Sequence, residues 1–443
     1  MTNYNERKTN IAQPRDTCTD EREDAAMKKT RRRIVCLLLT FVILGGSFAM
    51  GETGFYSEQA NEAWYQEMLQ NGILAPGNNY RLKKLIQRAQ DGEEITVAAI
   101  GGSITEGAGA KEYKECYAAR FFRGFAARYG KDGGRNVRLV NAGVGGTPSP
   151  FGLMRYQRDV VDRVQDPDGL PDLVVIEFSV NDWGEPTKHR AFESLVKTIL
   201  QQPNEPAVIL LFAVFQNGFN LQGELKSIGD AYGLMMVSIK DAAFPHVGKE
   251  WTAKEFFHDE YHPTSLGHGV MADCLLYAVD AAAARETDAQ DASLDVSPAY
   301  GTDFMGLITL YGSGDYPENV TLDRGGFARD DMSSYTNLPV GRVGGINFSR
   351  DSADPNAPLT FKAVFKKLLI AWRATNDARF GEAEILVDGK VKRTLKGAAD
   401  KWGQSEVILL WDSKDSLKHT VEIRMAEGSE TKRFTITAIS YVP

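Results

Sequence analysis

Between residues 95 and 284, short apolar runs alternate with longer amphipathic segments, and this alternation restricts the possible folds more than any other feature of the sequence. The apolar runs predict strands, and the segments between them have the apolar spacing of helices. Strands joined by helical crossovers form a parallel sheet with helices on both faces. We therefore predict a three-layer α/β domain over residues 95–285, with strands at 95–100, 137–140, 173–178, 207–214 and 234–239 and helices at 117–129, 156–164, 192–200, 221–232 and 266–284.

Different patterns flank this domain. Residues 55–94 have helical apolar spacing and predict a helical lead-in, and residues 286–299 have the small, acidic composition of a linker. Beyond the linker, apolar and polar residues alternate in short stretches, and Asp388-Gly389 is a strong hairpin signal. Residues 300–443 therefore predict a β-sandwich accessory domain of jelly-roll type, in keeping with the two or three domains that a chain of this length allows.

The N-terminal region has the pattern of an export signal. A basic cluster from Lys28 to Arg33 precedes the uncharged run 34–50, which is shorter than the ~20 residues of a comfortable membrane span. We expect 34–50 to be a signal peptide or an uncleaved signal anchor, and 1–33 to be a mis-start or a short cytoplasmic tail. The protein is thus expected outside a bacterial membrane, released or held at the cell surface, with membrane contact only through this segment.

Charge and cysteine content exclude two classes of protein. The net charge is −8 and basic residues do not cluster beyond the N-terminus, which argues against binding to nucleic acid. Four cysteines in 443 residues exclude a disulfide framework. Cys116 and Cys274 either pair after export or occupy buried positions on apolar helix faces.

Four small clusters of residues that could take part in catalysis or binding lie in loops around the predicted sheet. Three of them come directly after strands. Such loops meet at one edge of a parallel sheet, where ligands bind. The clusters centre on Ser103, on the glycines ending at Gly146, on Asn181, and on Asp259 with His262. Taken singly, they are also compatible with a helix N-cap, a glycine turn, an Asx-turn and an exposed loop. A zinc site built from His258, His262 and His268 is disfavoured, because Pro263 interrupts the helix that such spacing requires.

Together, the clusters resemble the conserved blocks of the SGNH hydrolases, also called GDSL-type hydrolases. The nucleophile block corresponds to 102–105, the glycine block to 141–146, the Asn-Asp block to 181–182 and the Asp-x-x-His block to 259–262. The resemblance covers about residues 94–284 and implies a flavodoxin-like sheet. Gly102 stands where the family name has its aspartate, a form similar to that of carbohydrate-active members.

The resemblance implies a role for each of these residues. Ser103 would be the nucleophile, His262 the proton carrier and Asp259 the group that orients the histidine. The Ser103 and Gly146 amides and the Asn181 side chain would form the oxyanion hole. Neither a metal nor another cofactor is expected.

The expected substrate is an acylated polysaccharide carrying small acyl groups, chiefly acetyl. Trp183, beside Asn181, either stacks on a sugar or packs as an ordinary aromatic residue. In the β-sandwich, Trp372, Trp402 and Trp411 are candidate glycan contacts, although this domain can equally serve only to brace the hydrolase. Two other functions remain open: an acyltransferase acting on cell-surface glycan, and a non-catalytic glycan-binding surface protein.

Overall fold

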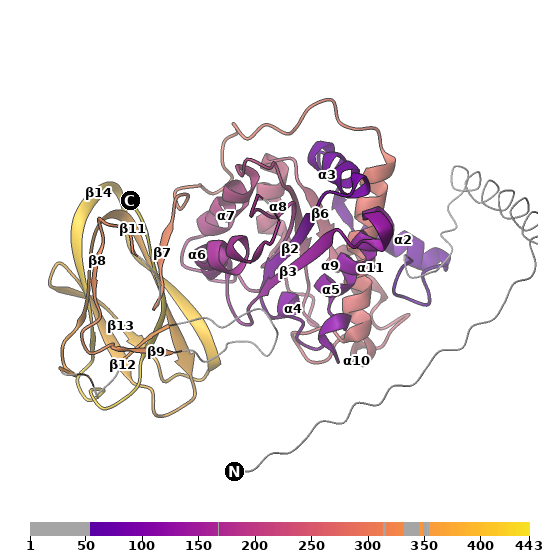
Figure 1. Cartoon of the computed structure of the whole chain (residues 1–443). Coiled ribbons are helices and arrows are strands. Elements are labelled where there is room, and N and C mark those ends of the chain that lie inside the picture. Colours follow the sequence, from indigo (N-terminus) through magenta and orange to yellow (C-terminus); the bar gives the residue numbers. More distant parts are fainter. Residues whose placement is uncertain (1–53, 167, 313–315, 332–344, 349–351, 353) are drawn as a thin grey trace, which may run out of the picture. The chain divides into compact units, whose positions relative to one another are not determined.

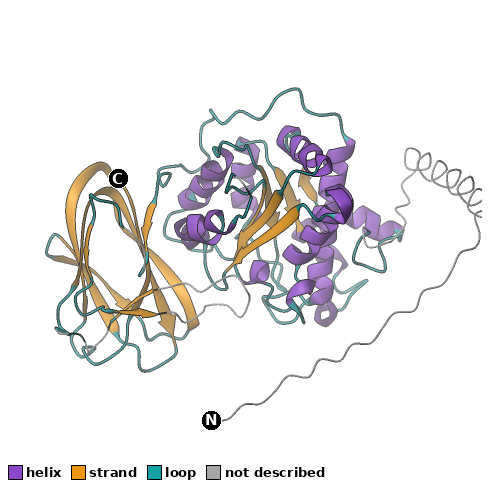
Figure 2. Cartoon of the chain, viewed as in Figure 1, coloured by secondary structure: helices purple, strands orange, loops and turns teal. Residues whose placement is uncertain are grey.

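The computed structural model describes residues 54–443 except 167, 313–315, 332–344, 349–351 and 353. The expectations for residues 1–33 and 34–50 lie outside the described residues. Within the described ranges, no helix is both long enough and apolar enough to cross a bilayer. Figures 1 and 2 show a group of helices around one sheet, formed by elements α2 to α11, and a second group made of strands, β7 to β15. We call these the α/β domain and the β domain.

The sheet of the α/β domain confirms the predicted alternation. Its strand order is β1-β6-β5-β4-β2-β3, and all neighbouring strands from β6 to β3 are parallel. Counting only the parallel strands, this is the flavodoxin-like order, in which the chain changes direction on either side of the first strand. The strands are β2 (Ile95–Gly101), β3 (Val137–Gly143), β4 (Leu173–Glu177), β5 (Ala207–Phe212) and β6 (Met235–Ser238).

Successive strand residues point to opposite faces, which divides the core in two. Val97 and Ala99 of β2 pack on one side, beneath α2 (Ala63–Asn71), α3 (Tyr80–Asp91), α5 (Tyr117–Tyr129) and α11 (Ser265–Ala284). Ala98 and Ile100 pack on the other, beneath α6 (Ser149–Asp159), α7 (Arg190–Leu200) and α8 (Gln222–Ala231). Short helices complete the domain: α4 (Ser103–Glu106), α9 (Ile239–Ala242), α10 (Ala253–Phe256), and 3₁₀ turns at Tyr113–Glu115, Lys131–Gly133, Val161–Arg163 and Phe244–His246.

Two elements differ from the sequence prediction. The lead-in contains a short strand, β1 (Ile73–Ala75), which pairs antiparallel with β6 at the sheet edge. A run of three residues is too short to show periodicity. Its strand conformation comes from pairing with the neighbouring strand β6. The helix predicted at 156–164 begins earlier, with Pro150 in the first turn of α6, and ends at Asp159. Cys116 and Cys274 are free thiols in buried positions.

The predicted C-terminal β domain is confirmed, and its strands are joined into one curled antiparallel sheet. The hydrogen-bonded order is β13-β12-β14-β11-β15-β10-β9, with β7 beside β15 and β8 beside β11. Strand β14 is long and continuous, and its middle section carries exposed polar residues. The Asp388-Gly389 hairpin is present, with positive φ at both residues.

The strands of the β domain have these bounds: β7 (Ile308–Leu310), β8 (Thr321–Asp323), β9 (Arg329–Asp331), β10 (Gly345–Asn347), β11 (Leu359–Thr375), β12 (Glu382–Val387), β13 (Lys390–Lys396), β14 (Trp402–Met425) and β15 (Thr435–Val442).

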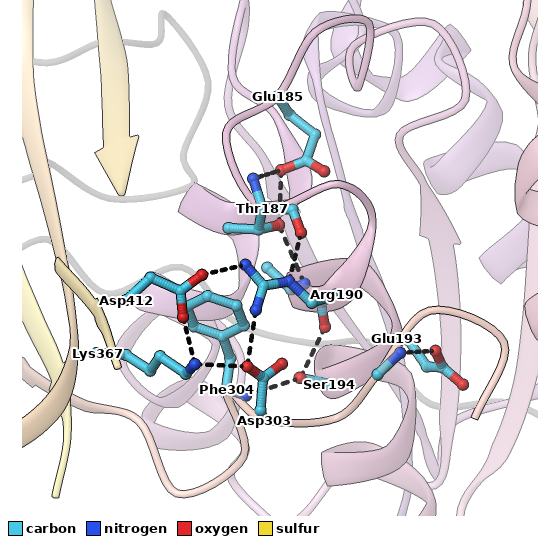
Figure 3. Close-up of polar contacts among 11 residues, drawn as sticks. Glu185, Thr187, Arg190, Glu193, Ser194, Asp303, Phe304, Lys367 and Asp412 are labelled. Atoms are coloured by element: carbon cyan, nitrogen blue, oxygen red, sulfur yellow. Dashed lines mark hydrogen bonds and ion pairs between the residues drawn. The ribbon is translucent and has the colours of Figure 1, made fainter. Parts of the chain in front are cut away.

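Apolar packing and an ion cluster connect the β domain to α6 and α7. Leu369 and Ala371 of β11 share a buried cluster with residues of these helices. Arg190 of α7 donates to Asp303 and to Asp412, at 2.8 Å each. Lys367 of β11 lies within ion-pair distance of the same two carboxylates, as Figure 3 shows. Strand β14, which contains Asp412, is therefore held against the α/β domain.

The segment predicted as a linker is hydrogen-bonded along its length. Asn79 and Asp288 contact each other through backbone and side-chain groups. The segment's end is held by Glu193 of α7, whose buried carboxylate accepts from the backbone N–H groups of residues 299, 300 and 301 at 2.6–2.8 Å. These contacts fix the entry of the chain into the β domain.

Candidate active site

Ser103 is the first residue of α4, directly beyond β2. The turn that carries Ser103 is held by Glu177, the last residue of β4. The Glu177 carboxylate accepts a hydrogen bond from the Thr105 hydroxyl at 3.1 Å. Gly102 is required at the adjacent position, because a Cβ there would come within 2.2 Å of the Asn181 amide oxygen. The glycine that replaces the family's aspartate thus makes room for another predicted site residue.

His262 and Asp259 lie on a tight loop that precedes α11. The loop is closed by the His258 N–H, which donates to the His262 carbonyl at 2.8 Å. His262 Nδ1 is 2.9 Å from both carboxylate oxygens of Asp259, and His262 Nε2 is 2.9 Å from Ser103 Oγ. The structure therefore aligns the serine, the histidine and the carboxylate in one hydrogen-bonded row.

The electrostatics of Asp259 suit a group that stays ionised. Partial burial favours its protonation, but hydrogen bonds from the His262 ring and from the Tyr261 N–H outweigh this effect, so the pKa of Asp259 lies below its ordinary value. An ionised Asp259 stabilises a positive charge on His262 and selects the tautomer in which Nδ1 carries a proton.

Gly146 and Asn181 reach the same cavity from the loops after β3 and β4. The cavity has a volume of about 550 Å³ and is lined by Ser103, Gly146, Asn181 and His262 among others. Gly146 has φ +66°, a conformation that suits glycine. The first N–H groups of a helix have no partner within it, so the Ser103 amide is available by its position at the start of α4. Gly146 and Asn181 thus line the same cavity as Ser103.

Several other residues around this cavity were not among the predicted catalytic and oxyanion-hole residues, although Trp402 was named as a candidate glycan contact. Phe215, Tyr261 and Trp402 line it, and Tyr261 and Trp402 are 51% and 56% exposed. Glu106 also lines it, and Gln404 lies behind the glycine loop. Glu106 follows the nucleophile block directly and was accessible to sequence reasoning, whereas no local signal marks Gln404.

Trp183 and His268, which were also named from the sequence, lie elsewhere. Trp183 is 78% exposed and is not among the described residues that line the cavity. His268 is buried in α11, where Nδ1 accepts from the Tyr117 N–H and Nε2 lies 3.0 Å from the Ala108 carbonyl. Burial lowers the pKa of His268 to about 4. Both of its ring nitrogens are therefore engaged with the backbone.

Comparison with known proteins finds a matching family model and similar solved structures. The model of the GDSL-like Lipase/Acylhydrolase family matches residues 99–270. A two-domain esterase (CEX) active on acetylated mannans has a similar crystal structure, with 25% identity, 84% of this chain and 98% of that chain covered, and a TM-score of 0.69. The structure of such an esterase co-crystallised with mannopentaose is 26% identical, with 84% of this chain and 97% of that chain covered and a TM-score of 0.69.

The similarity to the two-domain esterase spans both domains of this chain, since the α/β domain alone is far shorter than the matched length. No protein with a curated function matches significantly. The family match covers the loops that carry Ser103, Gly146, Asn181 and His262. Over residues 99–270 the α/β domain thus matches the GDSL-like lipase/acylhydrolase family, the SGNH hydrolases, and the two-domain chain is similar in structure to a carbohydrate esterase.

Proposed function

We propose that this protein is a serine esterase that removes acetyl groups from a polysaccharide outside the cell. The observation that carries the proposal is the row from Ser103 Oγ through His262 to Asp259, each step 2.9 Å long, at the wall of a cavity bordered by aromatic side chains. A hydroxyl aligned with an imidazole and a carboxylate is the arrangement that activates serine for attack on an ester.

In the proposed reaction, Ser103 Oγ attacks the acetyl carbonyl carbon while His262 Nε2 accepts the hydroxyl proton. The tetrahedral oxyanion accepts hydrogen bonds from the amides of Ser103 and Gly146 and from the Asn181 side chain. The intermediate collapses, His262 gives its proton to the departing sugar alkoxide, and the acetyl group stays on Ser103. Water then attacks this ester with His262 again as the base, which releases acetate and restores the serine.

Three observations support a polysaccharide as the substrate. Tyr261 and Trp402 expose large aromatic surfaces at the cavity, and aromatic faces are suited to stacking on sugar rings. The cavity is open and large enough for a substituted sugar. The structurally similar two-domain esterase acts on acetylated mannans. Acetylated mannan is therefore the first substrate to test.

The N-terminal sequence supports export as part of the same proposal. A cleaved signal would release the enzyme, and an uncleaved one would tether it to the membrane. N-terminal sequencing of protein recovered from medium and from membranes distinguishes these two forms. Full-length protein found only in the cytoplasm would contradict the proposed location.

The test of the activity compares wild type with Ser103→Ala. Acetate release is measured on acetylated mannan, xylan, pectin and peptidoglycan, and an acyl-length series of 4-nitrophenyl esters is run in parallel. We expect wild type to prefer acetyl esters and to release acetate from mannan, and Ser103→Ala to be inactive on both. Full activity of Ser103→Ala would refute the proposal, and transfer of acetyl to added mannopentaose in place of release would identify an acyltransferase.

A further inference from the structure

The peptide between Gly145 and Gly146 carries the N–H that is the proposed second oxyanion donor. Because both residues are glycines, no side chain restricts the rotation of this peptide. A Cβ on Gly145 would lie 2.8 Å from Glu106 Oε2, and a Cβ on Gly146 would lie 3.1 Å from both Trp402 and Gln404. The packing that excludes side chains here comes from both domains.

The preceding peptide unit, between Val144 and Gly145, is held by the α/β domain. The Gly145 N–H donates to Glu106 Oε2 at 2.7 Å. Glu106 is the last residue of α4, the short helix that begins with Ser103. This hydrogen bond therefore ties the glycine loop to the helix that carries the nucleophile.

The following peptide unit, between Gly146 and Thr147, is held by the β domain. Gln404 Nε2 donates to the Gly146 carbonyl at 3.4 Å and to Glu406 Oε1 at 3.0 Å. Lys401 Nζ in turn forms an ion pair with Glu406 Oε1 at 3.4 Å. The second hydrogen bond of Gln404 and the ion pair orient its amide, so that Nε2 can reach the Gly146 carbonyl.

We infer that Glu106 and Gln404 are positioning residues that fix the Gly145–Gly146 peptide from its two sides and aim its N–H at the developing oxyanion. The inference rests on the proposed esterase function. Its consequence is that the β domain contributes to the chemical step itself, in addition to any contact with the glycan. A substrate that lacks sugar must then also react more slowly when Gln404 is changed.

The test uses the full chain and 4-nitrophenyl acetate, an ester without a sugar. The variants are Glu106→Ala, Glu106→Gln, which keeps the acceptor oxygen, Gln404→Leu, and the exposed control Lys418→Ala on the same strand β14. We expect Glu106→Ala and Gln404→Leu to lower kcat about tenfold, less than the ~10²–10³ for loss of a donor, because the donor remains but is less well oriented.

The pattern across the variants separates positioning from general damage. KM should stay within about twofold of wild type, because the affected interaction forms only in the transition state. Glu106→Gln should recover most of the lost kcat, and Lys418→Ala should match wild type. Unfolding temperatures identify any variant that fails to fold, and Gln404→Met, which also lacks the donor, then replaces Gln404→Leu.

Two results would overturn the inference: wild-type kcat for Gln404→Leu or its replacement, or a Glu106→Gln variant as slow as Glu106→Ala. Ser103→Ala is measured in the same series. If it is inactive while Gln404→Leu and Glu106→Ala match wild type, only the positioning role fails. If Ser103→Ala is active, the esterase proposal itself fails.

Discussion

The two domains reach the Ser103 cavity in different ways. The α/β domain contributes Ser103, Gly146 and Asn181 from loops that directly follow parallel strands, where the topology of the sheet brings distant residues together. The β domain contributes Trp402 from the first residue of a strand, at a position that depends on how β14 packs against its neighbour. The first contribution follows from local sequence and a known topology, and the second only from tertiary packing.

The largest expected effect tests the chemical contribution of the α/β domain. Asn181→Ala should lower kcat by about 10²–10³ because it removes one proposed oxyanion donor. The folded structure should persist, since Asn181 lines an open cavity. Kinetics on 4-nitrophenyl acetate, with circular dichroism as the control for folding, checks the prediction. A loss below about threefold would exclude Asn181 from the oxyanion hole.

The next effect concerns a charge buried inside the same domain. Burial raises the pKa of Glu177 to about 7, and hydrogen bonds from Thr105 and the Gly102 N–H offset this only in part. Its folded-state pKa lies above the unfolded value, so the folded state binds the proton more tightly. Proton binding to Glu177 therefore contributes to the free energy of unfolding. This contribution is fully present well below pH 4.5 and is lost as the pH rises to about 7.

Glu177→Gln removes this titration but keeps an acceptor oxygen. Relative to wild type, the free energy of unfolding of Glu177→Gln should therefore rise by about 2–3 kcal/mol between pH 4.5 and pH 8.5. Urea unfolding at the two pH values measures the change. A difference between the two proteins that does not vary with pH would mean that Glu177 does not titrate in this range.

A smaller effect tests the contribution of the β domain to binding. Trp402→Ala should raise KM on acetylated mannan about 3- to 10-fold, through the loss of one aromatic stacking surface. Trp183→Ala is the matched control, because Trp183 is also exposed but lies outside the cavity lining. Equal effects of the two substitutions would remove the special role of Trp402.

The smallest effect concerns the ion cluster between the domains. Arg190→Met should lower the free energy of unfolding by about 1 kcal/mol, because the partners Asp303 and Asp412 are partly exposed and screened by water. Urea unfolding at low and high salt provides the measurement, and the difference should shrink as salt screens the wild-type pairs. A salt-independent loss would assign the effect to packing on Phe304.

Sequence reasoning succeeded where periodicity and loop position determine the structure. The five parallel strands and the helix α5 follow from apolar spacing and sheet topology, and the proximity of Ser103 and His262 was implied by the resemblance to the SGNH hydrolases. It missed β1, whose conformation is imposed by pairing with β6. Of the tryptophans it named as candidate sugar contacts, Trp402 lines the cavity, whereas Trp183 is not among the described residues of the lining.

Covalent trapping tests the central claim most directly. The folded protein is treated with a serine-directed phosphonate, digested, and mapped by mass spectrometry, with Ser103→Ala treated in parallel. We predict a single adduct on Ser103 in wild type and none in the variant, because only a hydroxyl activated by His262 reacts at such a rate. The absence of an adduct on Ser103, or equal labelling of the two proteins, would contradict the assignment of this serine as the nucleophile.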